Sequence, residues 1–340
     1  MATLHRTLVM RECPTAMCHA PTMLRLADGG VLIAWFGGSA EGADDVGIYL
    51  ARGANGAFDA PRLIAQSDEP HWNPVLFAPD EKTIALYYKV GRWIRSWRTM
   101  VRLSDDGGHS FSEARELVPG DAGGRGPVRA KPIRLMSGEI AAPASTEDGP
   151  WRAFVDLSED NGAHWRRSSP IAIDPAALAV EAAAVKSRIP VSEQSFHGRG
   201  VIQPTLWESA PGVVHALMRS TEGRVFRADS TDGGRHFAEA FPTDIPNPNS
   251  GIDVAQLEDG RLVLAHNPVA DNWGARSPMR LSISRDNGRH FETFMDLDGG
   301  EGEFAYPAIL ADGGHVHVCY TYKRQNIAYW AIDMAEGRKS

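Results

Sequence analysis

One eight-residue pattern occurs four times in this 340-residue chain and limits the folds that the chain can adopt. The pattern is Ser-x-Asp-x-Gly-x-x-aromatic, and its copies are Ser104 to Phe111, Ser158 to Trp165, Ser230 to Phe237 and Ser284 to Phe291. Ser and Asp side chains bond nearby backbone N–H groups, Gly tolerates a positive φ, and the aromatic ring can fill a core. The pattern therefore predicts a repeated hairpin turn in which the Asp residues are structural.

A second repeat, two apolar strands joined by a turn, occurs six times. Its aligned turn positions are Gly30, Thr83, Gly138, Gly212, Gly260 and Gly314, at intervals of 53, 55, 74, 48 and 54 residues. Periods of about 40–50 residues are typical of β-propeller blades. We therefore expect an all-β fold, a six-bladed β-propeller with four-stranded blades and the Ser/Asp turns on their outer hairpins.

The two repeats together predict a single domain over residues 1–340. The 74-residue interval indicates an insertion at about 174–200, with a short helix at 176–186. The segment 52–58 is similar to a shortened copy of the eight-residue pattern in the first blade. The segment 4–10 is expected to pair with 326–332, because closing the ring in this way removes exposed strand edges.

Composition limits the partners. A net charge of −8 argues against nucleic acid, because phosphate binding needs a basic surface. The first ten residues contain no apolar run of the length that a signal peptide or membrane span needs, which predicts a cytoplasmic protein without a membrane partner.

Cys13, Cys18 and Cys319 lack metal-site spacing and are read as reduced thiols. No nucleotide-binding motif is present, so we expect no cofactor and no metal, and a homo-oligomer remains open.

Polar residues mark the beginnings of the predicted inner strands, which line the central channel of a propeller. The aligned column is Ala20, Asn73, Lys131, Gln203, Asp253 and Tyr306, with His19 beside Ala20. Such residues can simply bond one another and water, but Lys, Asp, His and Tyr together favour a ligand site. Glu147 and Arg129 could join the same rim, although a surface Glu–Arg pair is the commoner outcome.

These motifs resemble the sialidase superfamily, whose propellers carry such turns as Asp boxes, and the resemblance covers nearly the whole chain. It implies that Arg219 and Arg276 match the second and third arginines of the carboxylate-binding triad and that Tyr306 matches the nucleophile. His19 stands in place of the first arginine, and Gln203 in place of the glutamate that assists the tyrosine.

The resemblance also implies an acid/base residue in the cluster Glu41, Asp44 and Asp45. Strand alternation from Asp45 through Gly47 favours Asp45 over Asp44 for this role. Substrate contacts are expected from the remaining members of the site, which are Asp44, Asn73, Lys131 and Asp253. The implied function is hydrolysis of a terminal acidic sugar, with Tyr306 forming a covalent intermediate.

Two alternatives fit the same residues. Because Gln203 cannot act as the base that a glutamate would be, elimination from a uronate is one of them, with Tyr306 or His19 moving the proton. A carbohydrate-binding propeller without catalytic activity is the other.

Overall fold

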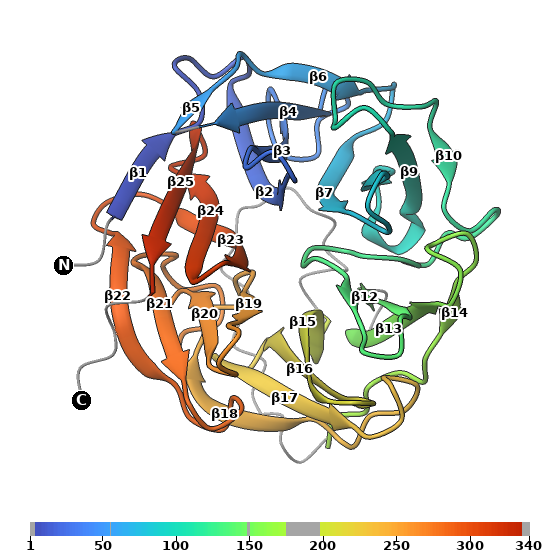
Figure 1. Cartoon of the computed structure of the whole chain (residues 1–340), viewed down its shortest axis with the longest axis vertical. Helices are drawn as coiled ribbons and strands as arrows, with labels where there is room; N and C mark the ends of the chain where they lie inside the picture. The colour runs from blue at the N-terminus through green and yellow to red at the C-terminus, as the bar shows by residue number, and fades with distance from the viewer. Residues whose placement is uncertain (1–3, 55, 148–149, 175–197, 335–340) are drawn as a thin grey trace.

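The computed structural model describes residues 4–54, 56–147, 150–174 and 198–334, and in these residues six β-sheets are arranged in a ring (Figure 1). Blade 1 contains β2 (Met17–Arg25), β3 (Val31–Gly38), β4 (Gly47–Ala54), β5 (Ala57–Phe58) and β6 (Arg62–Ala65). Blade 2 contains β7 (His71–Phe77), β8 (Ile84–Val90), β9 (Arg98–Ser104) and β10 (Arg115–Glu116), with the 3-10 turn η1 (Ile94–Ser96) between β8 and β9. Blade 3 contains β11 (Ile133–Arg134), β12 (Ile140–Thr146), β13 (Arg152–Ser158) and β14 (Arg166–Arg167).

The second half of the chain forms three further blades. Blade 4 contains β15 (Val201–Ala210), β16 (Val213–Ser220), β17 (Arg224–Ser230) and β18 (Phe241–Pro246). Blade 5 contains β19 (Asp253–Gln256), β20 (Leu262–His266), β21 (Met279–Ser284) and β22 (Glu292–Asp298). Blade 6 contains β23 (Phe304–Asp312), β24 (His315–Tyr322), β25 (Asn326–Asp333) and, as its outermost strand, β1 (Leu4–Leu8).

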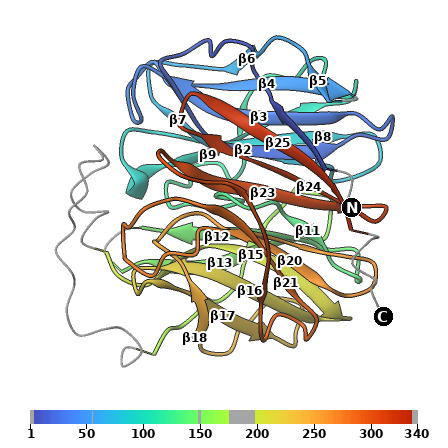
Figure 2. The same cartoon turned by 90° about the vertical axis from the view of Figure 1, so that its left-hand side faces the viewer.

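The predicted six-bladed ring and its closure are confirmed. β1 pairs antiparallel with β25 from Leu4↔Ile332 to Leu8↔Ala328, so the N-terminal strand completes the last blade. In the side view, the strands of blade 6 cross between blade 1 and blade 5 (Figure 2). The expectation of four strands in every blade is wrong for blade 1, where β5 and β6 both pair with β4. The insertion helix expected at 176–186 lies outside the described residues.

The repeated turns have the predicted geometry. In each of the four Asp boxes, the Ser Oγ accepts a hydrogen bond from the Gly N–H at 2.8–3.0 Å, and the Asp Oδ1 accepts one from the Ser Oγ–H at 2.8–2.9 Å. The four Gly residues have φ between +75° and +87°, as the turn requires. Each box follows the third strand of its blade, far from the channel, which supports the structural role predicted for the Asp residues.

Apolar side chains fill the spaces between neighbouring blades. Leu32 of blade 1 and Leu86 of blade 2, both fully buried, belong to one such cluster, and Val155 of blade 3 and Phe226 of blade 4 belong to another. Burying a side chain of this size contributes roughly 1.5–3 kcal/mol. This packing holds the inner strands in fixed positions around the axis.

Candidate active site

Four of the six inner strands have a bulge at the aligned polar column. The register breaks within β2, β7, β15 and β23. At these breaks Ala20, Asn73, Gln203 and Tyr306 have φ values of 52°, 40°, 51° and 56°. Non-glycine residues rarely adopt this left-handed conformation, which costs free energy and is concentrated at functional sites. Since a bulge re-aims a side chain, the four bulges determine how these column residues are presented.

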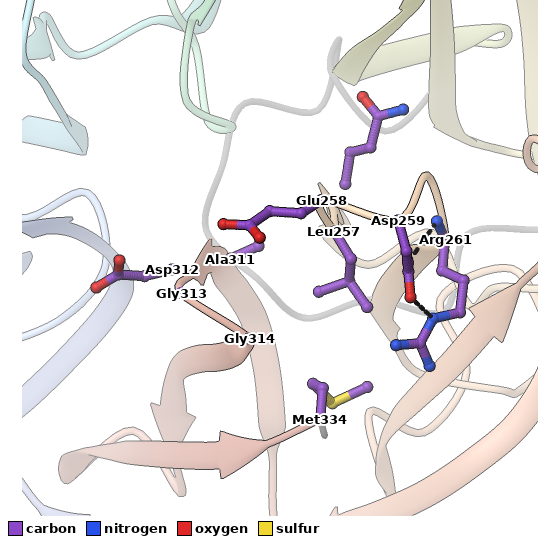
Figure 3. A pocket seen from close by; sticks show the side chains of 10 residues that line it. Leu257, Glu258, Asp259, Arg261, Ala311, Asp312, Gly313, Gly314 and Met334 are labelled. Atoms are coloured by element: carbon purple, nitrogen blue, oxygen red, sulfur yellow. Dashed lines mark hydrogen bonds and ion pairs between the residues drawn. The ribbon is translucent and has the colours of Figure 1, made fainter. Parts of the chain in front are cut away.

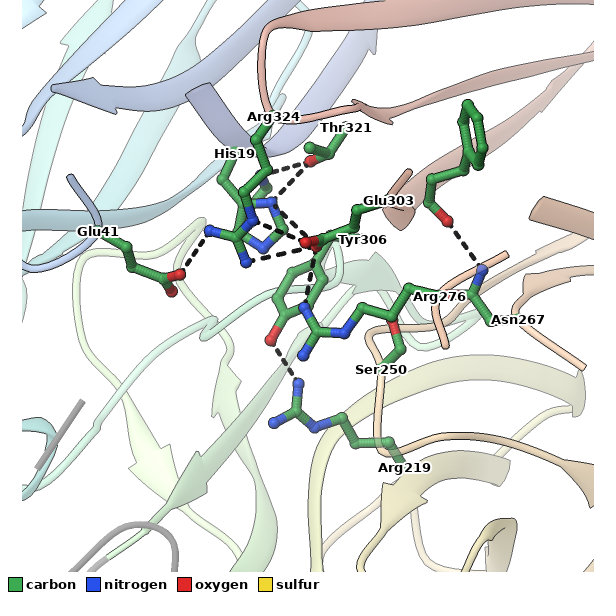
Figure 4. Close-up of polar contacts among 12 residues, drawn as sticks. His19, Glu41, Arg219, Ser250, Asn267, Arg276, Glu303, Tyr306, Thr321 and Arg324 are labelled. Carbon is green, nitrogen blue, oxygen red and sulfur yellow. Dashed lines mark hydrogen bonds and ion pairs between the residues drawn. The ribbon is translucent and has the colours of Figure 1, made fainter. Parts of the chain in front are cut away.

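Tyr306 lies at the centre of the site, on the bulge of β23. Its side chain is buried, with 9% of the residue exposed, and its hydroxyl accepts a hydrogen bond from Arg219 Nη1 at 2.6 Å (Figure 4). The guanidinium carbons of Arg129, Arg219 and Arg276 lie 5.2–5.7 Å from the centre of its ring. A Cβ on Gly251 would lie 3.2 Å from the Tyr306 ring, so only a residue without a side chain fits there comfortably.

Arg219 is positioned by β16 of blade 4. Besides the Tyr306 hydroxyl, its Nη1 donates to Gln203 Oε1 at 3.2 Å, and its guanidinium lies 5.8 Å from the Trp151 ring centre. The residue is 3% exposed, and no carboxylate is hydrogen-bonded to it among the described residues. Arg219 therefore keeps a buried positive charge that none of its bonded partners neutralises.

Two further arginines converge on the same place and share one carboxylate. Arg276 Nη1 donates to Glu303 Oε1 at 3.0 Å, and Arg324 Nε donates to Glu303 Oε2 at 2.7 Å. Arg324 Nη1 also donates to Glu41 Oε2 at 2.6 Å, so the loop of blade 1 is tied to the β24–β25 turn of blade 6 (Figure 4). Sequence analysis missed Arg324 and Glu303, because only the first strand of each blade was aligned.

His19 lies beneath these arginines with its ring centre 4.4 Å from that of Tyr306. It is 1% exposed, and its Nδ1 is 2.9 Å from Thr321 Oγ1 and 3.8 Å from Glu303 Oε1. Burial, and then the positive charges of Arg324 and the other nearby arginines, lower the pKa of His19 well below its usual value. The imidazole is therefore neutral at pH 7.

The Tyr306 cluster, which we define as His19, Arg219, Arg276, Glu303, Tyr306 and Arg324, sits on a propeller that matches a known family. The family model described as the BNR repeat-like domain matches residues 29–318. The chain belongs to the BNR repeat-like family. No curated protein matches it in sequence.

Solved structures resemble this BNR-repeat protein in fold. The Hadza microbial sialidase Hz136 aligns with a TM-score of 0.75 and 16% identity over 95% of this chain and 66% of that chain. A protein of unknown function from Dyadobacter fermentans aligns with a TM-score of 0.75 and 16% identity over 97% and 99%. The NanB sialidase from Streptococcus pneumoniae aligns with a TM-score of 0.73 and 12% identity over 96% and 70%. The chain thus spans about two thirds of the length of these two sialidases, and identities this low establish the fold alone.

Lys131 and Asp253 of the BNR-repeat fold bond each other. Lys131 Nζ lies 3.0 Å from both Asp253 carboxylate oxygens, which also accept bonds from Thr205 Oγ1 and Ile309 N–H at 2.6 and 3.0 Å. Asp253 is only 1% exposed. The ion pair links the segment before β11 to the start of β19, and the substrate contacts expected of Lys131 and Asp253 stay a prediction.

Arg129 also fills the channel and is not the surface residue that sequence analysis favoured. It is 1% exposed and donates hydrogen bonds to the backbone carbonyls of Pro21, Tyr306 and Pro307. These bonds link blades 1, 3 and 6 and hold the bulge on which Tyr306 lies. Asn73 occupies the corresponding bulge of blade 2, with no hydrogen bond to the Tyr306 cluster among the described residues.

The acidic loop between β3 and β4 differs from the prediction. β4 begins at Gly47, so strand alternation does not orient Asp45, which is exposed and accepts hydrogen bonds from Ser39 N and Oγ. Asp44, also exposed, pairs with Arg92 at 2.9 Å. Glu41 is the member of this loop that the structure joins to the Tyr306 cluster.

Glu147 carries a buried carboxyl group on which the positive charge of Arg219 acts. It is 8% exposed, and burial raises the pKa of the Glu147 carboxyl, while the positive charge of Arg219 partly lowers it. A carboxyl group with a raised pKa is suited to donating a proton near neutral pH. Sequence analysis gave this residue little weight because its burial could not be read from its neighbours.

A separate pocket of about 320 Å³ lies at the other end of β19 and β23 (Figure 3). Its wall includes Glu258, Asp312 and Met334, and Asp259, whose carboxylate pairs with Arg261 at 2.7 Å. The acidic lining and its place at the far end of the inner strands separate it from the Tyr306 cluster.

The described residues contain neither a cluster of metal-ligating side chains nor a membrane-spanning helix. They contain no group of three or more His, Cys, Asp or Glu side chains that could hold a metal ion. None of their helices is long and apolar enough to span a membrane.

Proposed function

We propose that this protein is a glycoside hydrolase that acts on a terminal sugar bearing a carboxylate. The observation that carries the proposal is the hydrogen bond from Arg219 to the Tyr306 hydroxyl, with Arg276 and Arg324 converging on the same place. A guanidinium fork binds a carboxylate through paired, charge-assisted hydrogen bonds.

The charge of the site favours an anion. The site contains four guanidinium groups, those of Arg129, Arg219, Arg276 and Arg324. Two of them, Arg276 and Arg324, bond the carboxylates of Glu41 and Glu303. With His19 neutral, the balance is two positive charges. Arg324 thus supplies from blade 6 the third guanidinium that is missing from blade 1, where His19 stands.

In the proposed reaction the Tyr306 oxygen attacks the anomeric carbon, and the bond from that carbon to the leaving-group oxygen breaks. The leaving oxygen takes a proton from a carboxyl group of the site, for which Asp45 and Glu147 are the candidates. Arg219, aimed at the phenol oxygen, stabilises the negative charge that develops when the phenol loses its proton. The phenol proton passes to water. In the second half of the reaction, the carboxylate left by the acid takes a proton from a water molecule, the water oxygen bonds the anomeric carbon, and the bond from that carbon to Tyr306 breaks, so the tyrosine regains a proton.

A second candidate is elimination from a uronate, which the neutral His19 beside Tyr306 favours. The arginines would neutralise the carboxylate and acidify the adjacent C–H, and His19 would remove that proton. Elimination leaves an unsaturated uronate, which absorbs ultraviolet light. Hydrolysis forms no such product.

The test is a panel of sialosides and uronate-terminated glycosides, assayed for both released reducing sugar and ultraviolet absorbance. Reducing sugar without absorbance supports the proposed hydrolase. Both signals together would support elimination, and neither, with retained binding, would indicate a carbohydrate-binding propeller.

A further inference from the structure

A pocket of about 330 Å³ lies between blades 2 and 3, beside the Tyr306 cluster. We call it the blade 2–3 pocket and define it by Arg95, Trp97, Glu147, Arg152 and Arg167. Its volume falls in the range of small-ligand sites, about 300–1,000 Å³. Nothing in the proposed reaction on one terminal sugar uses its arginines.

The pocket adjoins the proposed active site through direct contacts. Ser145, in its wall, accepts a hydrogen bond from Gln203 N–H at 3.2 Å, and Gln203 Oε1 in turn bonds Arg219. Pro150 and Arg152 of the wall flank Trp151, whose ring lies 5.8 Å from the Arg219 guanidinium. A sugar held by Arg219 therefore has the blade 2–3 pocket next to it.

The three arginines of the pocket have no carboxylate partner among the described residues. Arg167 stacks on the Phe154 ring at 3.8 Å, and the carboxylates whose charges act on it bond elsewhere. Asp156 pairs with Arg125, and Asp121 accepts the N–H groups of its own loop.

The three arginines are exposed to solvent, so an anion can pair with them without first breaking an existing ion pair. Desolvation lowers the pKa of Arg167, and the positive charges of Arg125 and Arg152 lower it further. The single acid of the wall, Glu147, has a raised pKa and offsets little of this positive charge. Trp97 adds a buried indole N–H without a hydrogen-bond partner among the described residues.

We propose that the blade 2–3 pocket is a second subsite that binds an acidic group, a carboxylate or a sulfate ester, on the sugar next to the terminal one. The substrate is then an oligosaccharide with at least two acidic residues. This inference rests on the proposed function, since it takes the terminal acidic sugar to be held by Arg219.

The test is calorimetric binding of one-acid and two-acid probes to the full chain. N-acetylneuraminic acid and galacturonic acid carry one carboxylate, α2,8-linked disialic acid and digalacturonate carry two, and a chondroitin sulfate disaccharide carries one carboxylate and one sulfate ester. The proposal predicts that the double variant Arg152→Gln/Arg167→Gln binds its preferred two-acid probe about tenfold more weakly or worse, with unchanged affinity for the one-acid probe. The sulfate and carboxylate probes show which group the pocket prefers.

The matched control is Arg166→Gln, which removes an exposed arginine of the same strand that pairs loosely with Glu159 at 3.7 Å. It should leave all affinities unchanged. Unaltered two-acid binding in the double variant, or an equal loss for one-acid and two-acid probes, would overturn the subsite. If the proposed function is wrong, the result differs: Arg219→Gln then binds the one-acid probes with the same affinity as the wild type.

Discussion

Arg219 Nη1 donates a hydrogen bond of 2.6 Å to the hydroxyl of Tyr306, joining blade 4 to blade 6 across the channel. The two residues are 87 positions apart in the chain, and each is held by its own strand. A tyrosine hydroxyl fixed by a buried guanidinium has lost its freedom to rotate toward water. The contact therefore orients the oxygen and places positive charge where a phenolate would form.

Arg324 should act as a carboxylate-binding residue. We expect Arg324→Gln to weaken binding of an acidic sugar by roughly tenfold to a hundredfold, because a hydrogen bond to a charged group contributes about 1.5–3 kcal/mol. Calorimetric titration measures the change. The neighbouring Lys323→Gln, which removes an exposed cation, is the control, and equal affinity loss in both variants would assign the effect to net charge instead.

Glu147 and Asp45 can be distinguished as proton donors by pH–rate profiles. If Glu147 is the acid, activity falls as pH rises through its raised pKa, since only the protonated carboxyl can donate. Glu147→Gln should then remove that limb and lower turnover by about a hundredfold or more on substrates with poor leaving groups. Substrates with activated leaving groups need no proton and should be affected little. The same pattern in Asp45→Asn, with an unchanged profile in Glu147→Gln, would assign the role to Asp45.

His19 should make the fold less stable in acid. The unfolded imidazole takes up a proton near its ordinary pKa of about 6.5, but the folded one does so only at lower pH, so stability falls as pH drops below 6.5. His71, His266 and His317 act in the same direction, since burial lowers their pKa values too. Between about pH 8 and about pH 5, the Tm of the His19→Gln variant should fall by less than the Tm of the wild type does. An unchanged pH dependence would contradict a neutral His19, and exposed His109→Gln serves as the control.

The Asp boxes should affect stability without affecting ligand binding. Asp232 accepts hydrogen bonds from Ser230 Oγ and His236 N–H at 2.8 and 2.9 Å, so Asp232→Ala should lower the free energy of unfolding by about 1–2 kcal/mol. Urea denaturation measures this loss against Asp244→Ala, an exposed position of the same blade. Reduced ligand affinity at unchanged stability would show that the box has a role beyond the turn.

The repeats could be predicted from sequence because each is local. Each box needs only eight consecutive residues, and the hairpin of two apolar strands recurs at intervals of roughly fifty residues. These spacings were enough to predict the fold, the number of blades and the closure of the ring. The column alignment also found Tyr306 and Gln203, because the bulges fall at equivalent places in their strands.

The contacts between blades could not be predicted in the same way. Lys131 and Asp253 share a column, yet the sequence does not show that they neutralise each other. Arg324 lies in a hairpin turn that no alignment of inner strands includes, and Glu303 precedes its strand by one residue. Such pairings depend on how residues of distant blades and of turns outside the aligned strands meet in three dimensions, which one-dimensional spacing does not record.

The central claim is that Tyr306 is the reacting group of a site whose arginines hold an acidic sugar. Its most direct test compares turnover and ligand affinity in Tyr306→Phe, which deletes only the hydroxyl oxygen and its proton, using the best substrate of the panel. We predict that the variant binds the acidic sugar within about twofold of the wild type and loses turnover, whereas Arg219→Gln loses affinity as well. Wild-type turnover in Tyr306→Phe would contradict the account.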